Sequence, residues 1–263
     1  MEDLLFLVKI AIDGVILPVF ISQNIMSFVT DCVKLNRLTH YEGCLIKKDN
    51  VLFIKDELSK VKEEVFLDIE KILDSRDEET KKIVLSNLEN VIIEKKFTLN
   101  DHYDPKSNKI KYFFEKGKYP LLLNASSSCY LEEQNIILSG FKQQYDWIVI
   151  GDALNKGYTE LLATRIFRND FRISLDDPLI KMAKQIEETF TDPKDMEALY
   201  FRHDLPGLIS HLENFMDRSK AIYLLLDIDL YKFDKNILNP MCIYDKKTIN
   251  DRLSKIKSKK MDI

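Results

Sequence analysis

The stretch KYPLLLNASSSCYLEEQNIILSGF, residues 118 to 141, decides how this chain of 263 residues is interpreted. Pro120 suits the first turn of a helix, and the apolar residues after it predict a helix from Tyr119 to about Cys129. The run NIILSGF that follows is typical of a short strand. The segment therefore predicts a helix and then a strand, and residues 119 to 131 contain no histidine and no acidic side chain.

A second stretch, IGDALNKGYTELLATRIF at residues 150 to 167, predicts another helix. Asp152 is expected to cap its start, because an aspartate oxygen accepts hydrogen bonds from the first unpaired backbone N–H groups. Gly157 interrupts this helix and costs up to about 1 kcal/mol relative to alanine.

The rest of the chain predicts helices and short strands, with no repeat period and no linker rich in Gly, Ser or Pro. Helices are expected up to about residue 38 and at 57–73, 77–90, 176–190, 193–201, 205–217, 219–232 and 246–258. Strands are expected in a hairpin around Lys47–Asn50 and at 90–99, 110–115 and 147–151, with a polar loop at 101–109. We expect one continuous unit, with a mixed helix and hairpin part at 1–110 and a helical part at 111–263.

The composition indicates a soluble globular protein with enough apolar material for a sizeable core. The chain is 45% hydrophobic and 31% charged, and its net charge of -4 gives no reason to expect a nucleic-acid partner. The basic run at 252–260 is interpreted as a solvated, frayed helix end. The apolar run at 4–21 has the length of a membrane span, but Lys9, Asp13 and Pro18 interrupt it, so we expect a buried helix and no span.

The cysteines and histidines predict no metal site of a standard spacing. The four cysteines stand singly, so we expect buried thiols in a cytoplasmic protein: Cys32, Cys44, Cys129 and Cys242. The four histidines include no pair at i, i+4: His40, His102, His203 and His211. Phosphate-binding glycine loops and the strained serine turn of hydrolases are also missing.

One cluster of four polar residues leaves open the alternative that the protein is an enzyme. His203, Asp204, His211 and Glu213 lie close in sequence, and their convergence in a pocket would suit a hydrolase or a metal site. The competing interpretation is that His203 and Asp204 start a helix and that His211 is a half-exposed surface residue.

The two stretches quoted first resemble small bacterial zincin-type metallopeptidases of the HExxH, gluzincin-like group. Their pattern is H-E-L-L-H-M-A-S-S, a strand ending in S-G-F, and then L-N-E-G-Y-T-E-L-L-T-x-R-x-F. The resemblance continues into DMEALYFRHDLPGLISHLENF and LLLDIDLY, and covers roughly residues 110 to 232. It implies an α+β, predominantly helical, zincin-like fold in which the helices at 119–129 and 152–167 pack side by side, with Tyr119, Leu123 and Lys156 facing each other.

The resemblance fails at the positions that carry the chemistry. Tyr119 and Leu123 stand in place of the two zinc-binding histidines, Pro120 in place of the general base, and Lys156 in place of the third ligand. Zinc needs deprotonated nitrogen, oxygen or sulfur donors around one point, and these four side chains supply none of them. We therefore expect no catalytic residues, no metal and no cofactor.

The resemblance therefore predicts a zincin-like fold without its catalytic side chains. We expect a catalytically inactive metallopeptidase-like protein, a pseudoenzyme that binds a peptide or protein through the former substrate cleft or another surface. Its binding residues would be Tyr119, Asn124, Lys156 and Glu160, with the Lys156 ammonium near the former metal position and paired with Glu160 or the Tyr119 hydroxyl. The alternatives are an enzyme working around His203 and a purely structural or regulatory protein, in which Tyr119 and Leu123 would fill the vacated site.

Overall fold

The computed structural model describes residues 63–74, 76–95, 101–168, 176–236, 249–254 and 256. The helices expected up to residue 38, the hairpin around Lys47–Asn50 and the apolar run at 4–21 lie outside these residues. So do three of the four cysteines, and the fourth, Cys129, is half-buried rather than buried.

The first described elements are two helices, α5 (Glu63–Leu73) and α6 (Glu78–Leu88). On α5, Val65, Ile69 and Ile72 are buried, as the helical spacing of the apolar residues predicts. Asp77 caps α6, because its Oδ1 accepts a hydrogen bond of 2.9 Å from the Thr80 backbone N–H.

A three-stranded sheet follows, formed by β1 (Ile92–Lys95), β2 (His102–Asp104) and β3 (Lys109–Tyr112). The strand order is β1-β3-β2, with β1 parallel and β2 antiparallel to β3. The prediction of a loop throughout 101–109 was therefore wrong at its start, where β2 pairs with β3. The turn between them uses Asn108 in the left-handed region, with φ of 47°, which asparagine tolerates better than most residues.

The decisive stretch forms α7 (Glu115–Ser126), and an antiparallel meander of four strands follows it. The strands are β4 (Ser128–Leu131), β5 (Ile136–Ser139), β6 (Lys142–Tyr145) and β7 (Ile148–Ile150). The predicted helix at 119–129 was displaced, since α7 begins four residues earlier and Cys129 belongs to β4. Pro120 lies inside α7, where its ring removes one backbone N–H from the helix.

The described residues from Asp152 onward are mostly helical, but the part predicted as helical, 111–263, also contains the four strands of the meander. The residues from Asp152 onward contain α8 (Asp152–Ile166), α9 (Pro178–Glu187), α10 (Pro193–Phe201), α11 (Leu205–Leu212) and α12 (Arg218–Asn236). Asp177, Asp192 and Asp204 cap α9, α10 and α11 through their side chains, and a proline occupies the first or second position of each of these helices. Aspartate followed by proline is thus what divides this half of the chain into separate helices.

The start of α8 differs from the prediction. The cap position is Gly151, with φ of 76°, and the carboxylate that serves it comes from Asp229 on α12 rather than from Asp152. Asp229 accepts hydrogen bonds from the Gly151 N–H at 2.6 Å and the Ala153 N–H at 2.7 Å. Asp152 instead pairs with Lys142 at 3.4 Å.

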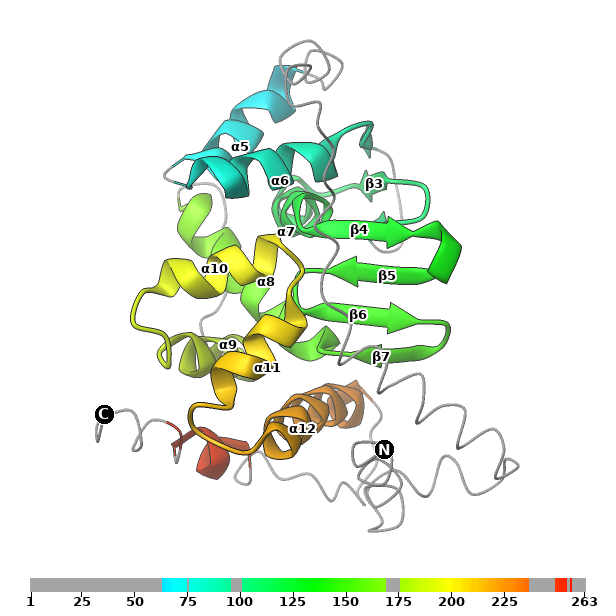
Figure 1. The fold of residues 1–263 in the computed structure, drawn as a ribbon. Coiled ribbons are helices and arrows are strands. Elements are labelled where there is room, and N and C mark those ends of the chain that lie inside the picture. The colour runs from blue at the N-terminus through cyan, green and yellow to red at the C-terminus, as the bar shows by residue number, and fades with distance from the viewer. Residues whose placement is uncertain are drawn as a thin grey trace.

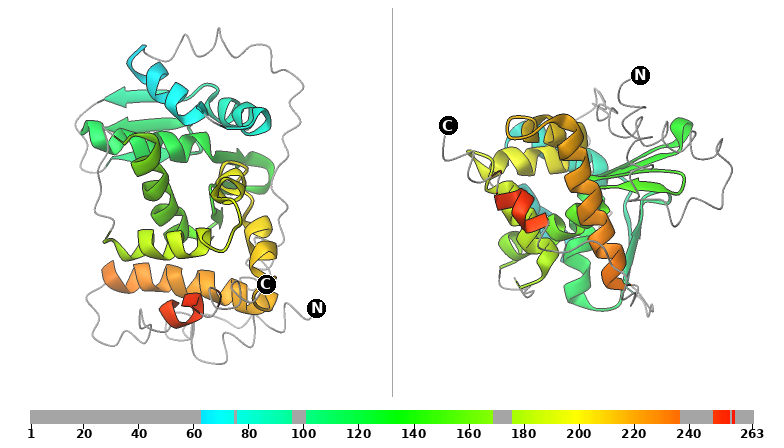
Figure 2. Two further views of the ribbon diagram at one scale, coloured as in Figure 1. Left: turned by 90° about the vertical axis from the view of Figure 1, so that its left-hand side faces the viewer. Right: turned by 90° about the horizontal axis from the view of Figure 1, so that it is seen from below.

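Figure 1 shows how these elements are arranged, with the strands of the meander extending to one side of α7 and α8, and α9, α10 and α11 gathered on the other. Helices α5 and α6 lie above α7, and α12 runs beneath α8 and α11 (Figures 1 and 2). The fold is α+β with more helix than strand. Among the helices of the described residues, none is long and apolar enough to cross a membrane.

Candidate functional site

Helices α7 and α8 pack against each other, as the sequence predicted, and they run antiparallel. Near the start of α7, Tyr119 stacks on Phe167 at the end of α8, with 4.4 Å between the ring centroids. Near the end of α7, Asn124 bonds to Asn155 and Thr159 in the first two turns of α8. The two predicted elements of the degenerate site are therefore neighbours.

The four positions that the resemblance assigns to catalysis differ in burial. Tyr119 is 8% exposed and Leu123 is fully buried, so both belong to the core, and Pro120 is half-buried within α7. Lys156 is exposed on α8. Tyr119 and Leu123 share one face of α7 by their i, i+4 spacing, and the interpretation of Lys156 as a buried cation was wrong because its side chain is exposed.

Lys156 lies near the start of α8, beside the residues that contact the end of α7. Its neighbour Asn155 and the residue one turn on, Thr159, direct their side chains at α7, and successive residues of a helix are rotated by about 100°. Lys156 also lies eleven residues before Phe167, which is about 16 Å along the helix axis from the end that Tyr119 contacts. The Lys156 ammonium is therefore not buried, and the Tyr119 hydroxyl is not its partner, although the sequence suggested both. Glu160 lies on the same side of α8 as Lys156, because the two residues are at i, i+4.

The buried cation of this region is Lys118, which the sequence analysis did not single out. Its Nζ lies 2.7 Å from Oδ2 of Asp68 on α5, and both side chains are less than a tenth exposed. The same ammonium is 5.2 Å from the centroid of the Tyr119 ring. Burial alone lowers the pKa of Lys118, but the hydrogen bond and the charge of Asp68 outweigh burial and raise the pKa.

A network of uncharged polar side chains joins α7, α8 and α10. The Oδ1 of Asn124 accepts hydrogen bonds from Asn155 Nδ2 at 3.4 Å and Thr159 Oγ1 at 3.3 Å. The Thr159 hydroxyl also lies 2.8 Å from the Tyr200 hydroxyl, and the Phe141 N–H donates to Asn155 Oδ1 at 3.2 Å. The polar atoms of these residues bond to each other inside the protein.

Burial of this network has two consequences. The desolvation of Tyr200 raises the pKa of its hydroxyl to about 12, so it stays a neutral donor at physiological pH. Asn124, predicted as a binding residue, already uses its side-chain oxygen inside the protein. The network therefore holds three helices together, and its polar atoms are poorly placed to bind a molecule from outside the protein.

Gly157 is explained by close packing. A Cβ placed on it would lie 2.3 Å from the Leu179 carbonyl oxygen, which no side chain tolerates. The interruption expected to weaken α8 is thus what allows α9 to approach it.

The alternative group around His203 is not brought together. His203 occupies the turn between α10 and α11 with φ of 46°, and Asp204 Oδ1 accepts a hydrogen bond of 2.7 Å from the Gly207 N–H. The His203 and Asp204 N–H groups bond to the carbonyls of Tyr200 and Leu199, the pattern that ends many helices. The interpretation as a helix start was confirmed for Asp204, which caps α11, whereas His203 lies in the turn that ends α10.

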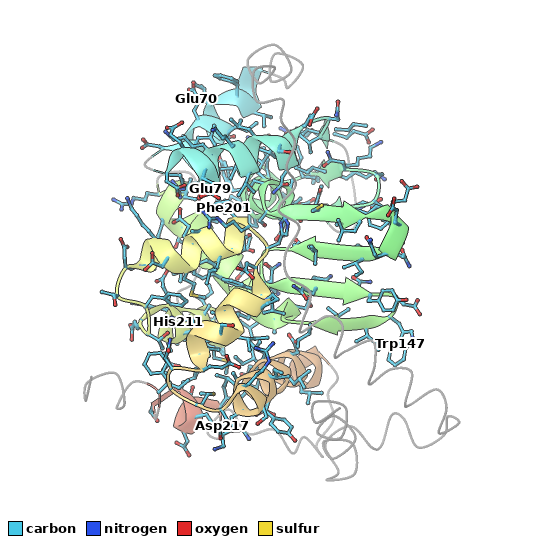
Figure 3. The ribbon with its side chains drawn as sticks, in the orientation of Figure 1. Glu70, Glu79, Trp147, Phe201, His211 and Asp217 are labelled. Atoms are coloured by element: carbon cyan, nitrogen blue, oxygen red, sulfur yellow. The ribbon has the colours of Figure 1, made fainter. Side chains whose placement is uncertain are left out.

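His211 lies at the other end of the eight-residue helix α11, where Figure 3 labels it. It stacks on Phe190 with 3.6 Å between centroids, and its Nε2 is 3.0 Å from the Thr189 hydroxyl. Glu213 pairs with Arg218 at 3.2 Å. Within the described part of the chain, no three His, Cys, Asp or Glu side chains are grouped so that they could hold a metal ion.

A second buried polar cluster, missed in the sequence, is ionic. Arg165 donates from both terminal nitrogens to the Glu187 carboxylate, at 2.6 and 2.5 Å, and the Tyr158 hydroxyl donates to the same carboxylate at 3.1 Å. Nearby, Arg76 Nε lies 2.7 Å from Glu197 Oε1. Burial raises the pKa of Glu197 although both arginines lower it, and burial raises the pKa of Tyr158 well above its usual value.

Comparisons of this chain with protein-family models, with curated proteins and with solved structures found no match.

Proposed function

We propose that this protein is a non-catalytic scaffold derived from a zincin-type metallopeptidase, and that it acts by binding a peptide or another protein. The observation that carries the proposal is the packing at the four degenerate positions. Tyr119 stacks on Phe167, Leu123 has no exposed surface and Lys156 is exposed. Where a peptidase holds its metal and its attacking water, this chain has a phenol and an isobutyl group in its core.

The chemistry of the side chains supports the absence of peptidase activity. A peptidase of this type needs a carboxylate to deprotonate the attacking water, and Pro120 has no side-chain base. The nearest charged pair, Lys118 with Asp68, is engaged in joining α7 to α5.

The same packing favours a second candidate function, a purely structural or regulatory protein. In that case the filled site is an ordinary core and the α8 surface around Lys156 has no partner. Lys156 separates the two candidates, because it is exposed and its removal leaves the core untouched.

Restoration of the ligands tests the zincin derivation. The parent chain is expected to take up no stoichiometric zinc, and the variant Tyr119→His, Pro120→Glu, Leu123→His, Lys156→Glu is expected to bind zinc, because two histidines at i, i+4 share one helix face. Zinc affinity should return before activity, because activity also requires neighbouring groups that orient the imidazoles. Calorimetric zinc titration of the folded quadruple variant is the measurement, and Lys156→Glu alone serves as its control. A folded variant that binds no more zinc than the parent would end the zincin derivation.

Peptide selection tests the binding role. Peptides selected from a display library on the full chain are expected to bind the Lys156→Glu variant at least about tenfold more weakly, because the charge reverses at the exposed residue of α8. Lys82→Glu, an exposed lysine on α6, is the matched control and should change little. Equal losses for both variants would favour the purely structural candidate.

A further inference from the structure

Helix α12 lies between two elements that it binds through two different carboxylates. Asp229 accepts the backbone N–H groups at the start of α8. Asp227 is two residues earlier, about 200° around the helix, and it pairs with Arg252 in the C-terminal helical segment. Figures 1 and 2 show this segment, in red, against α12, in orange.

The contact with the C-terminal segment is small and amphipathic. Residues 249 to 254 are helical, and Ile249, Leu253 and Ile256 recur at the i, i+4, i+7 spacing of one helix face, each at most 3% exposed. Arg252 is 42% exposed at its side chain, whereas Asp227 is only 7% exposed. The face of α12 thus presents one buried carboxylate, and the segment brings one cation and three apolar side chains to it.

Asp227 depends on that cation. Burial raises the pKa of the Asp227 carboxyl, while the Arg252 guanidinium acts in the opposite direction. A buried carboxylate without a counter-charge is costly, so this face of α12 is matched to a basic helix.

The sequence of the segment has the same character over a greater length. Seven of the fifteen residues from 246 to 260 are Lys or Arg and one is acidic, although the whole chain carries a net charge of -4. The expectation of a frayed, solvated end was therefore wrong for the described part of this run, which is seated in the core through Leu253 and Ile256. Twelve residues, 237 to 248, connect the segment to α12.

We propose that the α12 face around Asp227 is an exchangeable docking site for a basic amphipathic helix, occupied in cis by this chain's own residues 249–256. The partner that it fits is a helix with apolar residues at i, i+4 and i+7 and an arginine at i+3. In the described part of the segment, its charged contact with α12 is the Arg252–Asp227 pair, and a segment joined to the same chain has a local concentration on the order of millimolar. A partner helix of this pattern displaces the segment when the ratio of the partner's concentration to its dissociation constant exceeds the same ratio for the tethered segment. The site is independent of the α7–α8 pair and of the function proposed for it.

The test uses the full-length chain and a fluorescent peptide of residues 246–263, with binding followed by anisotropy. The Arg252→Glu chain is expected to bind the peptide at least about tenfold more tightly than the parent, because its own segment no longer competes. A peptide carrying Arg252→Glu should lose this binding, and so should the chain that carries Arg252→Glu together with Asp227→Asn. Leu253→Ser provides a second way to release the segment without a change of charge.

Two results would overturn the proposal. One is equal peptide affinity for the parent, the Arg252→Glu chain and the Leu253→Ser chain, since the segment would then not be competing for the site. The other is loss of the folded state in both released variants, measured by circular dichroism, because an exchangeable segment cannot be required for folding.

Discussion

The two buried polar clusters on α8 use opposite means to join helices. On the side of α7, the amides and hydroxyls of Asn124, Asn155, Thr159 and Tyr200 bond to one another without any charge. Beside α9, the carboxylate of Glu187 receives two bonds from Arg165 and one from Tyr158. An uncharged network loses one net hydrogen bond when a partner is removed, whereas a buried ion loses its counter-charge. The ionic cluster should therefore be more sensitive to substitution and to pH.

The largest effect is expected for Glu187→Ala. The substitution leaves the Arg165 guanidinium and the buried Tyr158 hydroxyl without their acceptor, and should lower the free energy of unfolding by about 3 kcal/mol. This loss is at the lower end of the range for breaking a buried ion pair, because the Arg165 side chain is 36% exposed and water screens its charge. Urea unfolding measures the loss, with Glu188→Ala, an exposed neighbour, as the control. Equal losses for the two variants would remove the energetic distinction between the clusters.

A smaller loss, of about 1–2 kcal/mol, is expected for Thr159→Val. Valine keeps the shape of threonine but leaves the Tyr200 hydroxyl and the Asn124 oxygen with one bond fewer in a buried site. The control is Thr164→Val, because the Thr164 hydroxyl is half-buried and bonds only within its own helix. If Thr159→Val costs as much as Glu187→Ala in the same urea experiment, charge is not what distinguishes the clusters.

The pH dependence of stability should come from the ionic cluster. The pKa of Glu197 is raised in the folded protein, so the folded protein binds a proton at this site more readily than the unfolded chain does. The contribution of Glu197 to the free energy of unfolding therefore falls as the pH rises from the unfolded pKa, near 4.5, through the folded pKa. Glu197→Gln should remove that decrease, which unfolding curves across this range would detect as a flatter profile. Thr159→Val should leave the shape of the profile unchanged, and a flattened profile in that variant would contradict the assignment.

The smallest effect is expected for Lys156→Ala, within about 0.5 kcal/mol, because the side chain is exposed and takes no part in the network. Asn155→Ala at the adjacent position should cost about 1–2 kcal/mol, since Asn155 bonds to Asn124 and to the Phe141 N–H. Thermal unfolding of the two variants side by side checks the difference. A large loss for Lys156→Ala would restore the interpretation of Lys156 as a buried cation.

Local sequence determined most of the elements of the C-terminal half. The helix predicted at 193–201 is α10 itself, and the aspartates before α9, α10 and α11 supply caps that depend only on neighbouring residues. The strand at β6 was not predicted, because its residues KQQY lack strong strand propensity and form a strand only through pairing with β5 and β7. The same limit applied to the start of α8, whose cap comes from Asp229, 78 residues from Gly151.

The sequence alone determined that Tyr119, Pro120, Leu123 and Lys156 offer no imidazole, carboxylate or thiolate, because that depends only on which side chains are present. It also determined that α7 and α8 exist, since their apolar spacing is local. Tertiary structure alone decided that Lys156 faces outward, that Lys118 is the buried cation and that Glu187 and Glu197 meet two arginines. The physical reason is that burial and ion pairing depend on the rotation and contact of helices far apart in the chain, which helical periodicity does not specify.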